Sequence, residues 1–239
     1  MFKYVKAFFK GLYKILLAYP KICRYAKNKD KYPIEERYAY ARKLIKIIIK
    51  AFDVEIKTEG FDKLNKDETY MIVGNHQGFI DALTLVCIFE KPMVFVSKIE
   101  SKKYPFVGKV NQFIDAIFID RDNIRDAVKM VKMCKEYLNN GRDVVIFPEG
   151  TRTRDENHMP GEYKAGALKP AYETKKKIVA IVMDGGYKVF SKKYKGKIEI
   201  KAKVLDVIDS NVYESKKTTE IAKEIEDKTI EKLIEIRKQ

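Results

Sequence analysis

The sequence contains no tryptophan, only three cysteines and only two histidines. The cysteines, Cys23, Cys87 and Cys134, are far apart and form no CxxC pair, which argues against a disulfide scaffold or a cysteine-rich zinc module and favours a reducing compartment. Two histidines, His76 and His158, are too few for a histidine-rich metal site. The GxSxG, GxxxxGK(S/T) and GxGxxG patterns are also absent, so no motif indicates a serine hydrolase, a P-loop protein or a dinucleotide-binding protein.

Long hydrophobic runs are missing as well. No uninterrupted apolar run approaches the roughly 18 residues of a membrane-spanning helix. A cleavable signal peptide fits poorly, because Lys10 and Lys14 interrupt its apolar region and no small-x-small cleavage site follows. What the chain has in excess is positive charge, +15 over 239 residues. Residues 1–50 hold 14 Lys and Arg against three acidic residues, so most of this excess lies at the N-terminus.

The first 52 residues predict two basic amphipathic helices. On a helical wheel of residues 2–19, one arc collects the lysines Lys3, Lys6, Lys10 and Lys14. The opposite side carries the apolar residues Tyr4, Val5, Phe8, Phe9, Leu12, Ile15, Leu16 and Tyr19. Pro20 is expected to end this helix, and residues 34–52 repeat the design after Pro33.

Three interpretations of this N-terminal segment compete. Both helices could pack on the core, lie on an anionic membrane surface, or bind nucleic acid. Phosphate contact does not require a wide aromatic and aliphatic face, so the membrane surface is favoured. Each lysine near such a surface contributes roughly 1 kcal/mol. The second helix is expected to divide its surface between core and lipid.

From residue 54 onward, short β-like runs alternate with helical stretches. The predicted strands are Val54–Thr58, Tyr70–Gly74, Met93–Ser97, Ala116–Ile119, Val144–Phe147, Ile178–Met183 and Lys197–Val204. The predicted helices are Asp81–Phe89, Ile124–Asn139, Ala165–Glu173 and Thr218–Arg237. This alternation predicts an α/β fold with a mixed, largely parallel sheet flanked by helices. We expect one α/β domain over residues 53–239, preceded by the membrane-associating two-helix segment 1–52.

One candidate for chemistry is the run from Val73 to Asp81, VGNHQGFID, which follows an apolar strand and leads into a helix. On an ideal helix His76 and Asp81 would not meet. They can meet if His76 lies in a turn that Gly74 and Gly78 permit and Asp81 lies in the opening of the helix. The carboxylate would then orient the imidazole, leaving its other nitrogen free to take a proton from an alcohol. The plainer alternative is a histidine that caps the helix or bonds a core carbonyl.

The second candidate is FPEGTR, residues 147–152, which follows the apolar strand ending at Ile146. This turn brings together backbone amides, a hydroxyl, a carboxylate and a fixed cation. Such a set suits an anion that carries a polyol, with Arg152 on the phosphate and Glu149 on a hydroxyl. The plainer alternative is a turn with a surface ion pair.

These two motifs together resemble the glycerophospholipid acyltransferases of the 1-acyl-glycerol-3-phosphate acyltransferase (PlsC-like) family. NHxxxxD comes first, and FPEGTR begins 66 residues after Asp81. The resemblance covers about residues 54–205 and includes the stretches Phe95–Glu100, Ile117–Arg121 and Tyr163–Ala167. One block departs from the family pattern, because residues 179–182 read VAIV without the usual proline.

The resemblance implies transfer of a fatty acyl group from a thioester, acyl-ACP or acyl-CoA, to the sn-2 hydroxyl of 1-acyl-sn-glycerol 3-phosphate. The product would be phosphatidic acid, for phospholipid biosynthesis. The resemblance implies His76 as the general base and Asp81 as its partner, with no cofactor and no metal. The substrate-binding residues it implies are Lys98, Arg121, Glu149, Gly150, Thr151 and Arg152.

A lipid acceptor also gives the basic N-terminal segment a purpose. We expect a peripheral, monotopic protein on the cytoplasmic face of the cell membrane, without a nucleic-acid partner. Two alternatives stay open. The acceptor could be glycerol 3-phosphate or another lysolipid, or the chain could be a non-catalytic protein that binds anionic membranes or nucleic acid. The presence of both His76 and Asp81 argues against the non-catalytic alternative.

Overall fold

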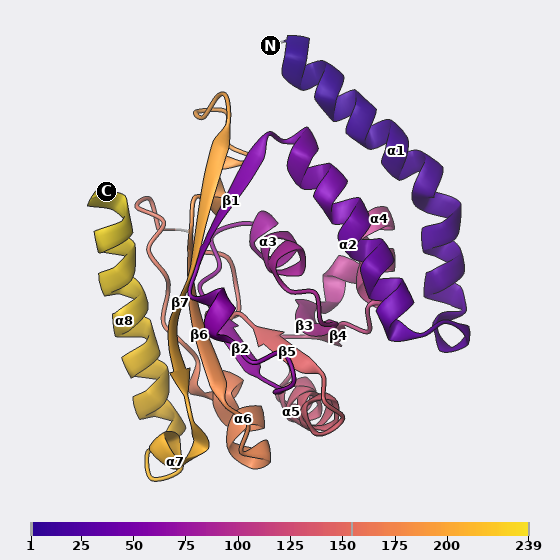
Figure 1. Ribbon diagram of the computed structural model, residues 1–239. Coiled ribbons are helices and arrows are strands. Elements are labelled where there is room, and N and C mark those ends of the chain that lie inside the picture. Colours follow the sequence, from indigo (N-terminus) through magenta and orange to yellow (C-terminus); the bar gives the residue numbers. More distant parts are fainter. Residues whose placement is uncertain (1, 154, 239) are drawn as a thin grey trace.

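A seven-stranded sheet in the order β1-β7-β6-β2-β5-β3-β4 organises the chain (Figure 1). The structure is a computed structural model that describes residues 2–153 and 155–238, except the side chains of residues 2–10 and of Leu12. The strands are β1 (Val54–Glu59), β2 (Met71–Gly74), β3 (Met93–Lys98), β4 (Ile117–Ile119), β5 (Asp143–Ile146), β6 (Ile178–Asp184) and β7 (Ile198–Ile208). Neighbouring strands run parallel except for β6 and β7, which confirms the predicted mixed, largely parallel sheet.

Helices cover both faces of this sheet. One face packs against α2 (Ile34–Ala51), α3 (Ile80–Ile88) and α4 (Pro105–Phe113). The other packs against α5 (Ile124–Asn139), α6 (Lys169–Thr174), α7 (Ser210–Tyr213) and α8 (Thr218–Lys238). Short 3₁₀ turns are η1 (Lys29–Lys31), η2 (Phe61–Lys63), η3 (Ile99–Lys103), η4 (Ala165–Leu168) and η5 (Gly186–Lys188). Every residue of β2, β5 and β6 is buried, as expected for strands covered on both faces.

The first helix, α1 (Phe2–Lys27), is longer than predicted, because Pro20 lies inside it. The expectation that Pro20 ends the helix is therefore wrong. Proline removes one helical hydrogen bond, but the turn that follows is held by packing: Ile22 and Tyr25 are both buried in the main core. The predicted roles of Lys3, Lys6 and Lys10, and of Tyr4, Val5, Phe8, Phe9 and Leu12, fall on side chains outside the described residues. Among the described residues, no helix combines the length and apolarity needed to cross a bilayer.

The second helix, α2, begins at Ile34 as predicted, ends at Ala51, one residue earlier than predicted, and is part of the core. Its buried residues include Tyr38, Leu44 and Ile45, which pack in one cluster with side chains of the sheet. Its lysines, Lys43, Lys46 and Lys50, stay exposed. Residues 34–51 are thus needed to cover the sheet, whatever else their exposed side contacts.

A largely buried ionic cluster connects α2 to two distant turns. Asp115 accepts hydrogen bonds from Arg37 of α2 at 3.1 Å and from Arg142, just before β5, at 2.9 Å, and it also pairs with Lys29. Arg37 donates further to the carbonyls of Tyr32 and Phe113. Burial alone would raise the pKa of Asp115, but the arginines outweigh it and hold the pKa below its ordinary value.

We predict that Asp115→Asn destabilises the fold by about 3–5 kcal/mol at neutral pH, because the buried Arg37 and the largely buried Arg142 are left as uncompensated cations. A lowered folded-state pKa contributes stability that is present above the unfolded pKa of about 3.9 and is lost as the pH falls through the folded value. Urea denaturation from neutral to acid pH measures both effects, and the variant should lack this acid-dependent loss. Asp122→Asn, in an exposed turn, is the matched control; equal losses for the two variants would contradict the prediction.

Candidate active site

The candidate residues gather at one edge of the sheet. Strands β2, β5, β3 and β4 are neighbours and run parallel, so their carboxyl ends meet there. His76 follows β2, Glu149 follows β5, Lys98 ends β3 and Arg121 follows β4. Ligands in open α/β sheets collect at this kind of edge.

His76 and Asp81 are in direct contact. Nδ1 of His76 lies 2.9 Å from Oδ2 of Asp81, and the same oxygen accepts the amides of Gln77 and Gly78, each at 2.7 Å. A carboxylate can only accept, so Nδ1 carries the proton and Nε2 is the nitrogen that can take one. Asp81 is fully buried, whereas the His76 side chain is 16% exposed. The predicted meeting of the two side chains therefore occurs. The turn amides donate to Asp81 and not to His76, so His76 is not the residue that caps the turn.

Glu149 joins the turn after β5 to the turn after β2. Its Oε1 accepts the amide of His76 at 2.7 Å, and its Oε2 accepts the amide of Gly161 at 2.9 Å. The amide of Thr153 donates back to the carbonyl of His76 at 2.8 Å, and the ring of Phe147 stacks on the imidazole at 4.2 Å. Burial raises the pKa of Glu149 above its ordinary value, although the two amides oppose the shift. Both carboxylate oxygens are thus engaged by backbone.

The predicted cations surround the edge without touching the His76–Asp81 pair. Lys98 pairs with Glu100 at 3.0 Å, and the charge of Glu100 also acts on Arg121, whose pKa is lowered by burial. Thr151 and Arg152 are exposed in the turn after β5, and Gly150 adopts a positive φ of 71°. Within the described chain, no group of three or more His, Cys, Asp or Glu is placed to hold a metal ion.

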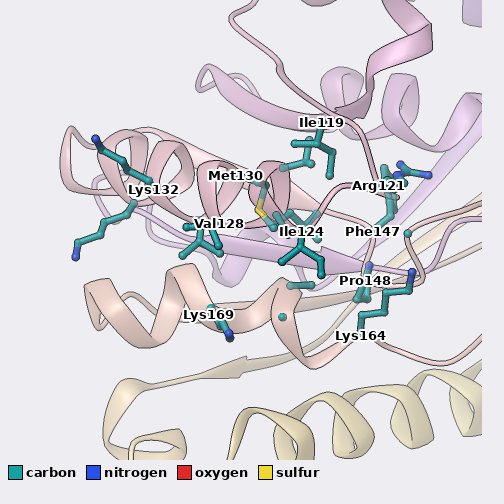
Figure 2. A pocket seen from close by; sticks show the side chains of 18 of the residues that line it. Ile119, Arg121, Ile124, Val128, Met130, Lys132, Phe147, Pro148, Lys164 and Lys169 are labelled. Atoms are coloured by element: carbon teal, nitrogen blue, oxygen red, sulfur yellow. The ribbon is translucent and has the colours of Figure 1, made fainter.

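A pocket of about 540 Å³ opens beside this turn, between the sheet edge, α5 and α6 (Figure 2). Arg121, Phe147 and Lys164 stand together at one end of it, and Gly150 also lines it. The remaining wall is mostly apolar and includes Val96, Ile119, Ile124, Ala127, Val128, Met130, Val131 and Ile146. Because Phe147 both stacks on His76 and lines the pocket, the imidazole and the apolar cavity are adjacent.

Several residues that hold the site in place were missed by the sequence reasoning. The side chain of Gln77 donates to Asp184 at 3.1 Å and accepts the amide of Gly185 at 3.1 Å. Arg237, near the end of α8, donates to the same Asp184 oxygen at 2.7 Å. Asn75 exchanges two hydrogen bonds with the backbone of Met183, both at 2.8 Å. Asn75 and Gln77 lie inside the NHxxxxD motif, which is a signal, whereas nothing in the sequence points to Arg237.

Gly186 packs directly on the His76–Asp81 pair. A Cβ at this position would lie far inside van der Waals contact with Oδ1 of Asp81 and close to Ile80. The φ of Gly186 is not positive, so the constraint is steric and not conformational. The carbonyl of Gly186 in turn leaves no spare room at Gly78. The start of the segment after β6 is therefore fitted against the turn that carries His76.

We predict that Gly186→Ala destabilises the protein by about 1–3 kcal/mol, because the added methyl must push Asp81 or η5 aside. Urea denaturation measures the loss. Gly166→Ala is the matched control, because a Cβ there meets no described atom within 4 Å. Equal stability of the two variants would contradict tight packing of Gly186 against Asp81.

Comparisons with known proteins agree with one another. The family model described as Acyltransferase matches residues 55–184. The probable 1-acyl-sn-glycerol-3-phosphate acyltransferase of Mycoplasma pneumoniae is 30% identical, over 67% of this chain and 61% of its own length. The 1-acyl-sn-glycerol-3-phosphate acyltransferase of Borreliella burgdorferi is 30% identical, over 80% of this chain and 77% of its own. The match thus spans about three fifths of the first of these relatives.

A solved structure shares the fold. The crystal structure of the 1-acyl-sn-glycerophosphate acyltransferase PlsC from Thermotoga maritima superposes with a TM-score of 0.72 at 19% identity. The superposition covers 99% of this chain and 98% of that one. The arrangement of the sheet and its helices is therefore common to both chains.

Proposed function

The chain belongs to the acyltransferase family, and we propose that it transfers a fatty acyl group from a thioester to the sn-2 hydroxyl of 1-acyl-sn-glycerol 3-phosphate, forming phosphatidic acid. The observation that carries this proposal is the His76–Asp81 pair beside an apolar pocket. A base for a hydroxyl next to a cavity for a hydrocarbon chain is what acyl transfer to an alcohol requires. The printed names of the relatives support this acceptor.

In the proposed reaction, Nε2 of His76 takes the proton of the acceptor hydroxyl while the oxygen attacks the thioester carbonyl. The carbon–sulfur bond then breaks, and the imidazolium returns the proton to the departing thiolate. Asp81 stabilises the imidazolium and keeps the ring oriented. No covalent enzyme intermediate is needed. The thiol of Cys87, whose pKa is raised by burial to about 11, is poorly suited to act as a nucleophile.

We assign acceptor binding to the turns around the pair. The phosphate would be bound by Lys98, Arg121 and Arg152. At Lys98 it must displace the carboxylate of Glu100, which pairs with the ammonium group. Glu149 would contribute by holding the backbone of His76, while Gly150 and Thr151 would shape the glycerol-phosphate site. The acyl chain would occupy the apolar pocket, and the donor, acyl-ACP or acyl-CoA, would arrive from solution.

We also propose that the protein works as a monotopic protein on the cytoplasmic face of the cell membrane. Tyr13, Leu16 and Leu17 of α1 are each more than half exposed, in a helix whose charged residues are all basic. Apolar side chains among lysines suit the interface of an anionic bilayer. Because α2 is part of the core, substitutions on α1 test this contact more cleanly than removal of residues 1–52.

We predict that His76→Ala lowers kcat for acylation of lysophosphatidic acid by about 100-fold or more, because the base is lost. Asp81→Asn should also lower kcat strongly, since it removes the carboxylate that orients the ring. The assay supplies acyl-ACP and acyl-CoA in parallel. His158→Ala removes the other histidine, whose ring stacks on Tyr187, and serves as the control. If His76→Ala keeps most of the wild-type rate, the proposed base is wrong.

We predict that Ala127→Phe shifts the preference toward shorter acyl chains by about tenfold or more in the ratio of kcat/KM values, because the ring fills part of the pocket. A series of acyl donors of increasing chain length measures the shift. Lys129→Phe adds the same ring to an exposed position of α5 that does not line the pocket. The same chain-length profile for both variants would place the acyl chain elsewhere.

A further inference from the structure

The loop between β6 and β7, residues 185–197, has an unusual composition. Its sequence, GGYKVFSKKYKGK, contains five lysines and no acidic residue. Phe190 is 55% exposed and Tyr194 is 42% exposed. Lys192, Lys193 and Lys195 are exposed too, and none of them forms an ion pair within the described residues. The loop therefore presents large aromatic side chains and unneutralised positive charge on one surface.

The first half of the loop is packed against the rest of the molecule. Gly186 lies against Asp81, and Tyr187 stacks on His158 at 3.8 Å. Phe190 contacts Phe52, at the end of α2, with ring centroids 5.2 Å apart, and it lies 6.2 Å from Phe79. Phe79 itself follows the His76 turn and is 37% exposed. The exposed aromatic surface thus extends from the loop to the edge of the candidate active site.

The loop also lies at the end of the molecule where the N-terminal helices meet the sheet. Strand β6 runs parallel to β2, so the loop after β6 and the His76 turn after β2 share one edge of the sheet. In Figure 1 this loop (orange) reaches the same end as the junction between α2 and β1 and the N-terminus of α1. The candidate active site around His76 would therefore lie between this loop and α1, at the end of the molecule that holds the junction of α2 and β1.

We infer that residues 185–197 form a second contact with an anionic phospholipid bilayer, separate from α1, in which Phe190 and Tyr194 enter the interface and the lysines bind headgroup phosphates. The inference rests on the proposed function in one respect, namely that the substrate is a membrane lipid. Two contacts, one on each side of the candidate site, would hold its opening against the bilayer. The acceptor could then reach His76 without leaving the lipid phase entirely.

The aromatic side chains favour a bilayer over nucleic acid as the partner. The apolar ring of phenylalanine and the ring of tyrosine, which carries a polar hydroxyl at its tip, insert at the interface of a membrane, and lysine ammonium groups bind lipid phosphates there. Neutralising a duplex backbone needs the lysines but leaves Phe190 and Phe79 without a purpose. The continuous ring contacts from Phe52 through Phe190 to Phe79 therefore argue for the lipid surface.

The test measures co-sedimentation of the full-length protein with vesicles of phosphatidylcholine containing phosphatidylglycerol, in the absence of acyl donor. One variant carries Phe190→Ser and Tyr194→Ser, and another carries Lys192→Gln, Lys193→Gln and Lys195→Gln. The matched controls are Val212→Ser with Ile234→Ser, two exposed apolar residues of α7 and α8, and Lys63→Gln, Lys66→Gln with Lys217→Gln, three exposed lysines outside the loop. Tyr13→Ser, Leu16→Ser and Leu17→Ser on α1 provide the reference for the first contact. Urea denaturation verifies that each variant is folded.

We expect each loop variant to bind these vesicles at least about tenfold more weakly than wild type. The lysine variant should lose its difference from wild type at high salt, and both control variants should bind like wild type. Wild-type binding by both loop variants would overturn the inference and leave the proposed reaction untouched. The inference would also be overturned if the loop variants bound duplex DNA more weakly than wild type but bound the vesicles equally well. A wild-type protein that binds vesicles through the loop but acylates no lysophosphatidic acid would instead refute the proposed reaction.

Discussion

The candidate site depends on one buried carboxylate. A carboxylate without compensating donors is costly to bury. Oδ2 of Asp81 accepts three hydrogen bonds from residues that come just before it in the chain, whereas the buried Oδ1 accepts none within the described residues. The same three bonds define the turn and orient the imidazole. The shape of the turn and the orientation of Nε2 therefore depend on the same hydrogen bonds, and a change that displaces Asp81 alters both.

Two further carboxylates act in the same way over longer distances. Glu149 accepts the amide of His76 and so joins two turns that lie 73 residues apart. Asp115 gathers Arg37 and Arg142 and so joins α2 to the turns around β4 and β5. Apolar packing explains the three layers, but it does not distinguish one loop arrangement from another. These carboxylates do distinguish one loop arrangement from another, because each needs hydrogen-bond donors at specific positions around its oxygens.

The sheet topology brings the candidate active site and the proposed membrane contacts to one end of the molecule. Parallel strands place the turns that carry His76, Glu149 and Arg121 at a single edge. Strand β6 runs parallel to β2, so the lysine- and aromatic-rich loop that joins it to the antiparallel β7 lies at that edge as well. On the proposed function, the residues that would do the chemistry and those that would touch the bilayer face the same substrate.

Local patterns in the sequence were enough for the fold class, for every strand and for the meeting of His76 with Asp81, because these depend on periodicity and on a spacing of five residues. Several local expectations were wrong. The helix predicted over Ala165–Glu173 is divided into the 3₁₀ turn η4 and the helix α6, and the short helix α7 was not predicted. Helix α4 was missed, since nine residues that begin with Pro105 and include Gly108 carry little helical signal. Pro20 predicts a helix end, but the helix continues past it because Ile22 and Tyr25 are buried in the core. Only the tertiary structure decided the Glu149 clamp, the Gln77–Asp184–Arg237 contacts and the fit of Gly186 on Asp81. Their partners lie as much as 107 residues apart, and no periodicity or spacing within a chain records which distant side chain will fill a given cavity or meet a given donor.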